Sequence, residues 1–94
     1  MHPNRNGFTD LDAGVAAEIR SEIARQKDVS VKGIAERLDI RRATLSSRVN
    51  GHAPFAPSLL AAVAAELGLK ASEIVARAEQ AAERADESAL AVAS

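Results

Sequence analysis

The side chains best suited to chemistry in this sequence gather between residues 41 and 52, and they suggest two kinds of chemistry. Ser46, Ser47 and His52 are two hydroxyls and an imidazole, the residue types of a nucleophile and its general base. They lie too near one another, on one predicted helix and the loop after it, to form a nucleophile, a base and a group that orients the base. We therefore expect no enzyme.

The second kind of chemistry is hydrogen bonding by arginine at the edges of a shallow helical face. Helical spacing turns Leu45 and Val49 inward and places four small or polar residues outward: Ala43, Ser46, Ser47 and Asn50. Arg42 lies near the start of this face and Arg48 lies on its flank. Small central residues let a helix enter a DNA major groove roughly 12 Å wide, where arginines reach guanine edges or phosphates. The pattern predicts a DNA recognition helix.

The composition excludes several other classes of protein. The 94 residues contain no cysteine and only two histidines, His2 and His52, so we expect no disulfide, no metal site and no cofactor or small-molecule ligand. No apolar run approaches the roughly 20 residues that span a bilayer, and the N-terminus lacks a signal-peptide core. We expect a soluble, cytoplasmic protein that is associated with the nucleoid when bound to DNA.

The net charge of −1 hides a strong asymmetry along the chain. Residues 20–52 carry four acidic and eight basic side chains and so have a charge of +4, whereas residues 1–19 carry −2 and residues 53–94 carry −3. The eight basic residues are Arg20, Arg25, Lys27, Lys32, Arg37, Arg41, Arg42 and Arg48. A positive middle between acidic ends is typical of a nucleic-acid-binding face, although on charge alone an ordinary solvated pattern is the alternative.

Periodicity and helix-capping residues predict an all-α bundle of four to five helices with no strand. The first helix begins near Thr9 and ends near Lys27 or Asp28, and one inward stripe is formed by Leu11, Val15, Ile19 and Ile23. Residues 1–8 are predicted to be a flexible tail, residues 9–78 the folded domain, and residues 79–94 an alanine-rich C-terminal helix extension or tail.

The remaining helices are delimited by their terminal residues. Ser30 caps a short second helix, the pair Asp39–Ile40 forms a tight turn, and a third helix runs from about residue 41 to residue 50, with Gly51 ending it. Pro57 suits the first turn of a fourth helix, whose core residues are Leu60, Val63, Ala64 and Leu67. Gly68 ends that helix, and a fifth starts between residues 70 and 72.

The segment 29–51, VSVKGIAERLDIRRATLSSRVNG, resembles the helix-turn-helix of the lambda-repressor/Cro family, also called the xenobiotic-response-element family. The features that agree are Ser30, Ile34, Ala35, Leu38, Ile40, Thr44, Leu45, Ser46, Asn50 and Gly51. The likeness extends over about residues 11–78, and the loop 50–55 is similar to that of small repressors from actinobacteria and their phages. The sequence departs from the family pattern at Val31, Asp39, Ala56 and Lys70.

This resemblance implies a role for each residue of the predicted site. Base readout is assigned to Arg42, Ala43, Ser46 and Ser47, and contacts to the DNA backbone are assigned to Ser30, Lys32, Arg41, Arg48, Asn50 and His52. The alternatives are an ion pair between Arg42 and Asp39 or a phosphate contact, small residues that serve helix spacing only, solvated arginines, and a plain loop histidine.

Helix-turn-helix domains of this size gain affinity by binding two half-sites, which predicts a homodimer. Its interface is assigned to Leu59 and the apolar side of the fifth helix, namely Ile74, Val75 and Ala78, unless these residues pack within one monomer. The predicted function is a transcriptional regulator, a repressor that occludes a promoter at a palindromic operator. The alternative is an antitoxin that represses its own operon while its acidic C-terminal helix masks a toxin.

Overall fold

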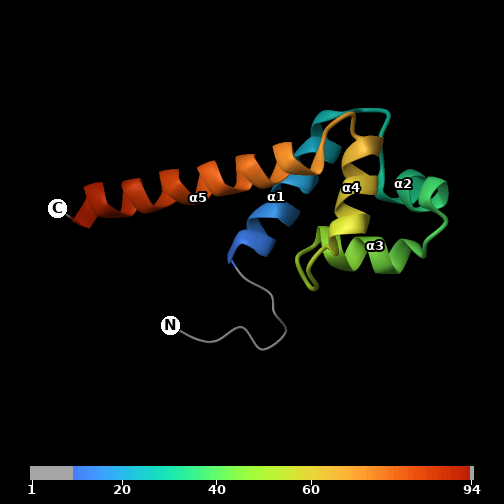
Figure 1. Cartoon of the computed structure of the whole chain (residues 1–94), viewed down its shortest axis with the longest axis horizontal. Coiled ribbons are helices and arrows are strands. Elements are labelled where there is room, and N and C mark those ends of the chain that lie inside the picture. Colours follow the sequence, from blue (N-terminus) through green and yellow to red (C-terminus); the bar gives the residue numbers. More distant parts are fainter. Residues whose placement is uncertain (1–9, 94) are drawn as a thin grey trace.

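The computed structural model describes the backbone of residues 10–93 and the side chains of residues 10–84. Within this range the chain forms helices and no strand, so the prediction of an all-α bundle is confirmed (Figure 1). The described helices are α1 (Asp10–Arg25), α2 (Val31–Leu38), α3 (Arg42–Val49), α4 (Pro57–Glu66) and α5 (Ala71–Ala93).

The helices form a bundle from which one helix extends. Helices α2, α3 and α4 lie together at one end of the molecule, and α1 packs against α3 and α5 (Figure 1). The C-terminal half of α5 continues beyond the other helices, which contributes to the molecule's greatest extent of 48 Å (Figure 1).

Each helix contributes one fully buried large side chain to a single core. These residues are Ile19, Ile34, Leu45, Val63 and Ile74. Burying an aliphatic side chain of this size stabilises a fold by about 1.5–3 kcal/mol. Because helices as short as α2 and α3 are marginal alone in water, this shared core is what stabilises them.

Three helices end in the same hydrogen-bonded turn. In each, one residue adopts a left-handed conformation: Asp39 after α2 (φ 56°), Gly51 after α3 (φ 80°) and Gly68 after α4 (φ 75°). After α2, the amide of Asp39 donates to the carbonyl of Glu36 (3.2 Å) and that of Ile40 donates to the carbonyl of Ala35 (3.0 Å). This is the Schellman pattern. The helix ends predicted at these three positions are confirmed.

The N-termini of the helices are satisfied in different ways. The Ser30 hydroxyl accepts a hydrogen bond from the amide of Gly33 (3.0 Å), as predicted for a cap of α2. A Cβ at Gly33 would lie 3.2 Å from that oxygen, a close contact that the glycine avoids. Pro57 occupies the first turn of α4 as predicted. At α5, Glu73 reaches back to accept from the amide of Lys70 (2.9 Å).

One prediction about α1 is wrong. Leu11 is 38% exposed, because α1 crosses α5 at Gly14 and its first turn leads away from α5 (Figure 1). The helix ends at Arg25, close to the predicted end near Lys27 or Asp28. The predicted cap Thr9 and the predicted tail, residues 1–8, lie outside the described residues.

An acidic residue, Glu22, occupies a buried position of α1 that the predicted apolar stripe did not include. Its carboxylate accepts hydrogen bonds from Arg25 (2.8 Å), Arg77 (3.2 Å) and Gln26 (3.3 Å). The Gln26 amide also donates to the carbonyl of Leu67 at the end of α4 (3.0 Å). Glu22 therefore joins α1 to α5 and, through Gln26, to α4.

Candidate nucleic-acid interface

Helix α3 turns its two apolar residues into the core and its small residues toward solvent. Leu45 is 0% exposed and Val49 is also buried, whereas Ala43 is exposed and Ser47 is half-buried. The orientation expected from helical spacing is thus confirmed. The outer surface of α3 therefore has no long side chain between Arg42 and Arg48.

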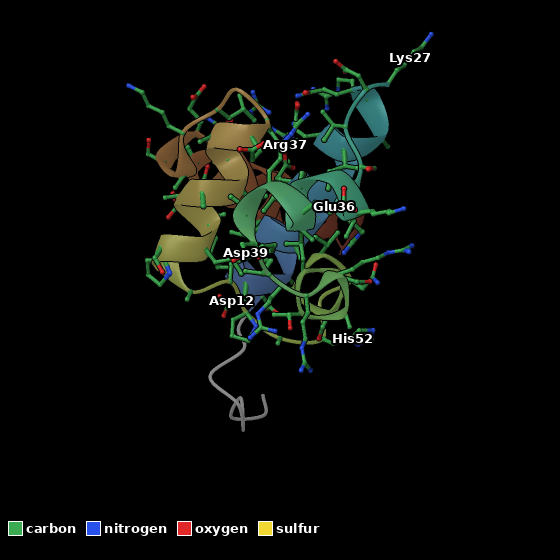
Figure 2. All side chains as sticks on the ribbon, turned by 90° about the vertical axis from the view of Figure 1, so that its right-hand side faces the viewer. Asp12, Lys27, Glu36, Arg37, Asp39 and His52 are labelled. Atoms are coloured by element: carbon green, nitrogen blue, oxygen red, sulfur yellow. The ribbon has the colours of Figure 1, made fainter. Side chains whose placement is uncertain are left out.

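Ala35 of α2 is hydrogen-bonded to the turn that leads into α3. This residue is buried, and its carbonyl accepts the amide of Ile40 from the turn between the two helices. The turn residue Asp39 itself is exposed (Figure 2).

Arg41, Arg42 and Lys32 are exposed, and their side chains make no hydrogen bond or ion pair with the described part of the chain. In particular, the Arg42–Asp39 ion pair, which was one of the two alternatives for Arg42, is not formed among these residues. The guanidinium donors of Arg41 and Arg42 are therefore available to an external acceptor at the N-terminal end of α3. That end also has no side-chain cap.

Two other predicted contact residues are turned onto their own helix. Arg48 donates to the carbonyl of Thr44 (3.3 Å), and the Asn50 amide donates to the Ser46 hydroxyl (3.2 Å). A guanidinium has five N–H donors, so Arg48 keeps donors for a second acceptor. Their predicted role toward DNA stays a prediction.

His52 lies just beyond the C-terminal end of α3 and is exposed (Figure 2). Its amide donates to the carbonyl of Ser47 (2.9 Å) as part of the turn at Gly51. The turn thus places the imidazole at the same edge of the molecule as α3.

The positive charge of residues 20–52 is less concentrated in space than it is in the sequence. Arg25 pairs with Glu22, and Arg37 pairs with Glu66 of α4 (3.2 Å). Lys27 points away from the bundle at the end opposite α3 (Figure 2). The basic side chains at the candidate interface are therefore those of α3, its preceding residue Arg41 and Lys32.

Sequence reasoning missed one contact of α3. The Arg20 guanidinium of α1 donates to the carbonyl of Val49 (2.7 Å). The two residues are 29 positions apart, and neither has a local pattern that predicts the contact.

The predicted dimer interface needs correction. Ile74 and Ala78 are 0% and 2% exposed because α5 packs them against the core, so a second copy cannot reach them while the chain keeps this fold. Leu59 and Val75 are partly buried and also pack against the core. Of the assigned residues, only these two keep exposed surface.

No group of three or more possible metal ligands occurs among the described residues. In the same part of the chain, no helix is both long enough and apolar enough to cross a membrane. No protein-family model, no curated protein and no solved structure matches this chain.

Proposed function

We propose that this protein is a sequence-specific regulator of transcription that binds double-stranded DNA by inserting α3 into the major groove. The observation that carries the proposal is the division of α3 into a buried apolar side and a shallow outer side. Leu45 anchors the helix with no exposed surface, while Ala43 stays exposed on the same helix. A helix of this kind can approach base edges closely, because no long side chain stands in the middle of its outer face.

The guanidinium groups of Arg41 and Arg42 at the start of α3 provide hydrogen-bond donors for the acceptor atoms of DNA. Arg42 is the residue proposed to bind guanine O6 and N7, a contact worth about 1–3 kcal/mol of discrimination. Ala43, Ser46 and Ser47 complete the base-reading surface, with the alanine methyl against a thymine methyl. Contacts to the DNA backbone are proposed for Ser30, Lys32, Arg41, Arg48, Asn50 and His52, which fix orientation without reading sequence.

The proposed repressor binds a palindromic operator as a homodimer, with one α3 in each of two major-groove half-sites about 34 Å apart. Repression follows from occlusion of a promoter. Because Ile74 and Ala78 are buried in the monomer, the proposed dimer contact uses the surface around Leu59 and Val75 instead.

A second candidate function is an antitoxin that also represses its own operon. The observation that favours it is the part of α5 that continues beyond the bundle (Figure 1). There Ala82, Glu83 and Arg84 are exposed. Co-purification of an enzyme whose activity the chain blocks supports this candidate, whereas a homodimer that binds its operator alone supports the repressor.

The main proposal is tested by selecting duplexes from a random pool and then measuring affinity over a series of salt concentrations. We expect the selected duplex to be palindromic and its affinity to fall steeply with salt. Arg42→Ala is expected to reduce the preference for the selected duplex by about 10-fold or more and to alter the salt slope little.

The matched control is Arg37→Ala, which removes an equal charge from α2 at a site paired with Glu66. It is expected to leave the preference unchanged. Equal binding of every duplex by the wild type would remove the proposal, and an unchanged preference in Arg42→Ala would remove the assigned role of Arg42.

A further inference from the structure

The C-terminal end of α3 is completed by a residue of another helix. The last four carbonyls of a helix have no partner within it. For α3, the amide of Asn50 binds the Ser46 carbonyl (2.9 Å), that of Gly51 binds the Arg48 carbonyl (3.1 Å), and that of His52 binds the Ser47 carbonyl (2.9 Å). The fourth carbonyl, that of Val49, accepts from Nη1 of Arg20 (2.7 Å).

The hydrogen bond from Arg20 to the Val49 carbonyl is expected to be stronger than one between neutral groups. The donor is charged, the distance is short, and the positive charge lies at the negative end of the helix dipole. It also joins two elements that are distant in sequence, since Arg20 belongs to α1.

Helix α3 has only eight residues, so its direction depends on what holds its two ends. The N-terminal end is fixed to α2 by the turn at Asp39. The C-terminal end has the buried Val49 side chain and the Arg20 bond to the Val49 carbonyl. Without that bond, the Val49 side chain is the one of these two contacts that remains to hold this end of α3.

We propose that Arg20 is a positioning residue for DNA readout, which sets the direction of α3 by holding the Val49 carbonyl to α1. This inference rests on the proposed function, because readout by α3 is what Arg20 would support. A direct contact between Arg20 and a DNA phosphate is a different role. The two roles differ in outcome, since a phosphate contact weakens binding to all sequences alike and lowers the salt slope by about one.

The experiment compares Arg20→Ala, Arg20→Lys and the control Arg37→Ala with the wild type. Amide hydrogen exchange is first measured without DNA. We expect exchange of the amides of Asn50, Gly51 and His52 to rise about 10-fold in Arg20→Ala, by loss of a charged hydrogen bond, and to stay unchanged in the control. Arg20→Gln repeats the test if the alanine variant fails to fold.

Each variant is then tested on the selected duplex and on duplexes with one base pair changed. We expect Arg20→Ala to lose about 10-fold in preference for the selected duplex, with an unchanged salt slope. Arg20→Lys, which keeps a charged donor, is expected to restore most of that preference.

Three results would overturn the inference. The first is an unchanged preference in Arg20→Ala, and the second is a uniform loss of affinity with a reduced salt slope. The third is a wild type without any preference, which removes the proposed function as well. In the first two results the wild type still prefers one duplex, so failure of the inference is distinguished from failure of the function.

Discussion

The contact between α1 and α5 and the outer face of α3 use the same residue types for opposite purposes. At the first, a Cβ placed on Gly14 would lie 3.3 Å from the Ala78 Cβ, so small residues allow two helices to pack closely. On α3, Ala43 is small but exposed, and nothing in the described chain packs over it.

The arginines of the two regions differ in the same way. Arg25 and Arg77 both bind the buried carboxylate of Glu22, whereas Arg41 and Arg42 have no acidic partner among the described residues. Residue type alone therefore does not separate a structural surface from a binding surface. The deciding property is whether other parts of the fold already pack over the small residues and already pair with the arginines.

The largest expected effect comes from enlarging the small residue at the α1–α5 contact. Gly14→Leu should lower the free energy of unfolding by about 3 kcal/mol, because the new side chain must displace Ala78 or separate the helices. Ala43→Leu should change stability by less than about 0.5 kcal/mol, since Ala43 is exposed, but should reduce DNA affinity at least about 10-fold. Urea unfolding followed by circular dichroism and duplex titrations measure the two quantities.

Ala24→Leu is the control for both variants, because Ala24 is exposed near the end of α1 farthest from α3 (Figure 1). It should leave stability and DNA affinity unchanged. If Ala43→Leu destabilised the fold as much as Gly14→Leu does, the contrast between the two regions would be wrong.

A smaller loss of stability is expected from Glu22→Ala. The substitution leaves the side chains of Arg25 and Arg77 without their acid, but these are 65% and 37% exposed, so water solvates them in part. We expect a loss of about 2 kcal/mol, below the range for a fully buried pair. Glu66→Ala, which removes the acid of the exposed pair with Arg37, should cost at most about 1 kcal/mol. Equal losses in the two variants, measured by urea unfolding, would show that burial of Glu22 adds nothing.

The smallest effect is expected at the turn between α2 and α3. Asp39 adopts a left-handed conformation that glycine adopts without strain. Asp39→Gly should raise the free energy of unfolding by about 0.5–1 kcal/mol, and Asp39→Ala should lower it. A thermal melt of each variant gives the sign, and destabilisation by glycine would indicate that the Asp39 side chain makes a contribution beyond its backbone.

Much of the fold could be predicted because its signals are local. Helix ends at Asp39, Gly51 and Gly68 were predictable from residues that tolerate a left-handed conformation, and the inward residues of α3 from helical spacing. Ser30 was recognisable as a cap because serine is a preferred residue at the start of a helix. Each of these signals lies within about one helical turn of the feature that it predicts.

The errors and omissions involve contacts between distant segments. Glu22 is charged and so was not expected in the core. One of the residues that pairs with it there, Arg77, lies 55 positions later in the sequence. The exposure of Leu11 and the burial of Ile74 depend on where α5 crosses α1, which helical spacing within either segment does not determine. Arg20 binds a backbone carbonyl, and every residue has one, so its partner leaves no mark in the sequence.

Because α5 is one continuous helix, its length determines where a partner bound to its outer turns would lie relative to the core. Helix α5 passes from the core into solvent as one element (Figure 1). A residue inserted between Ala82 and Glu83 would rotate the outer turns by about 100° around the helix axis and advance them by about 1.5 Å. An insertion of seven residues would restore nearly the original phase at a greater distance. The number of residues in α5 therefore determines both the reach and the angular orientation of its outer turns relative to the core.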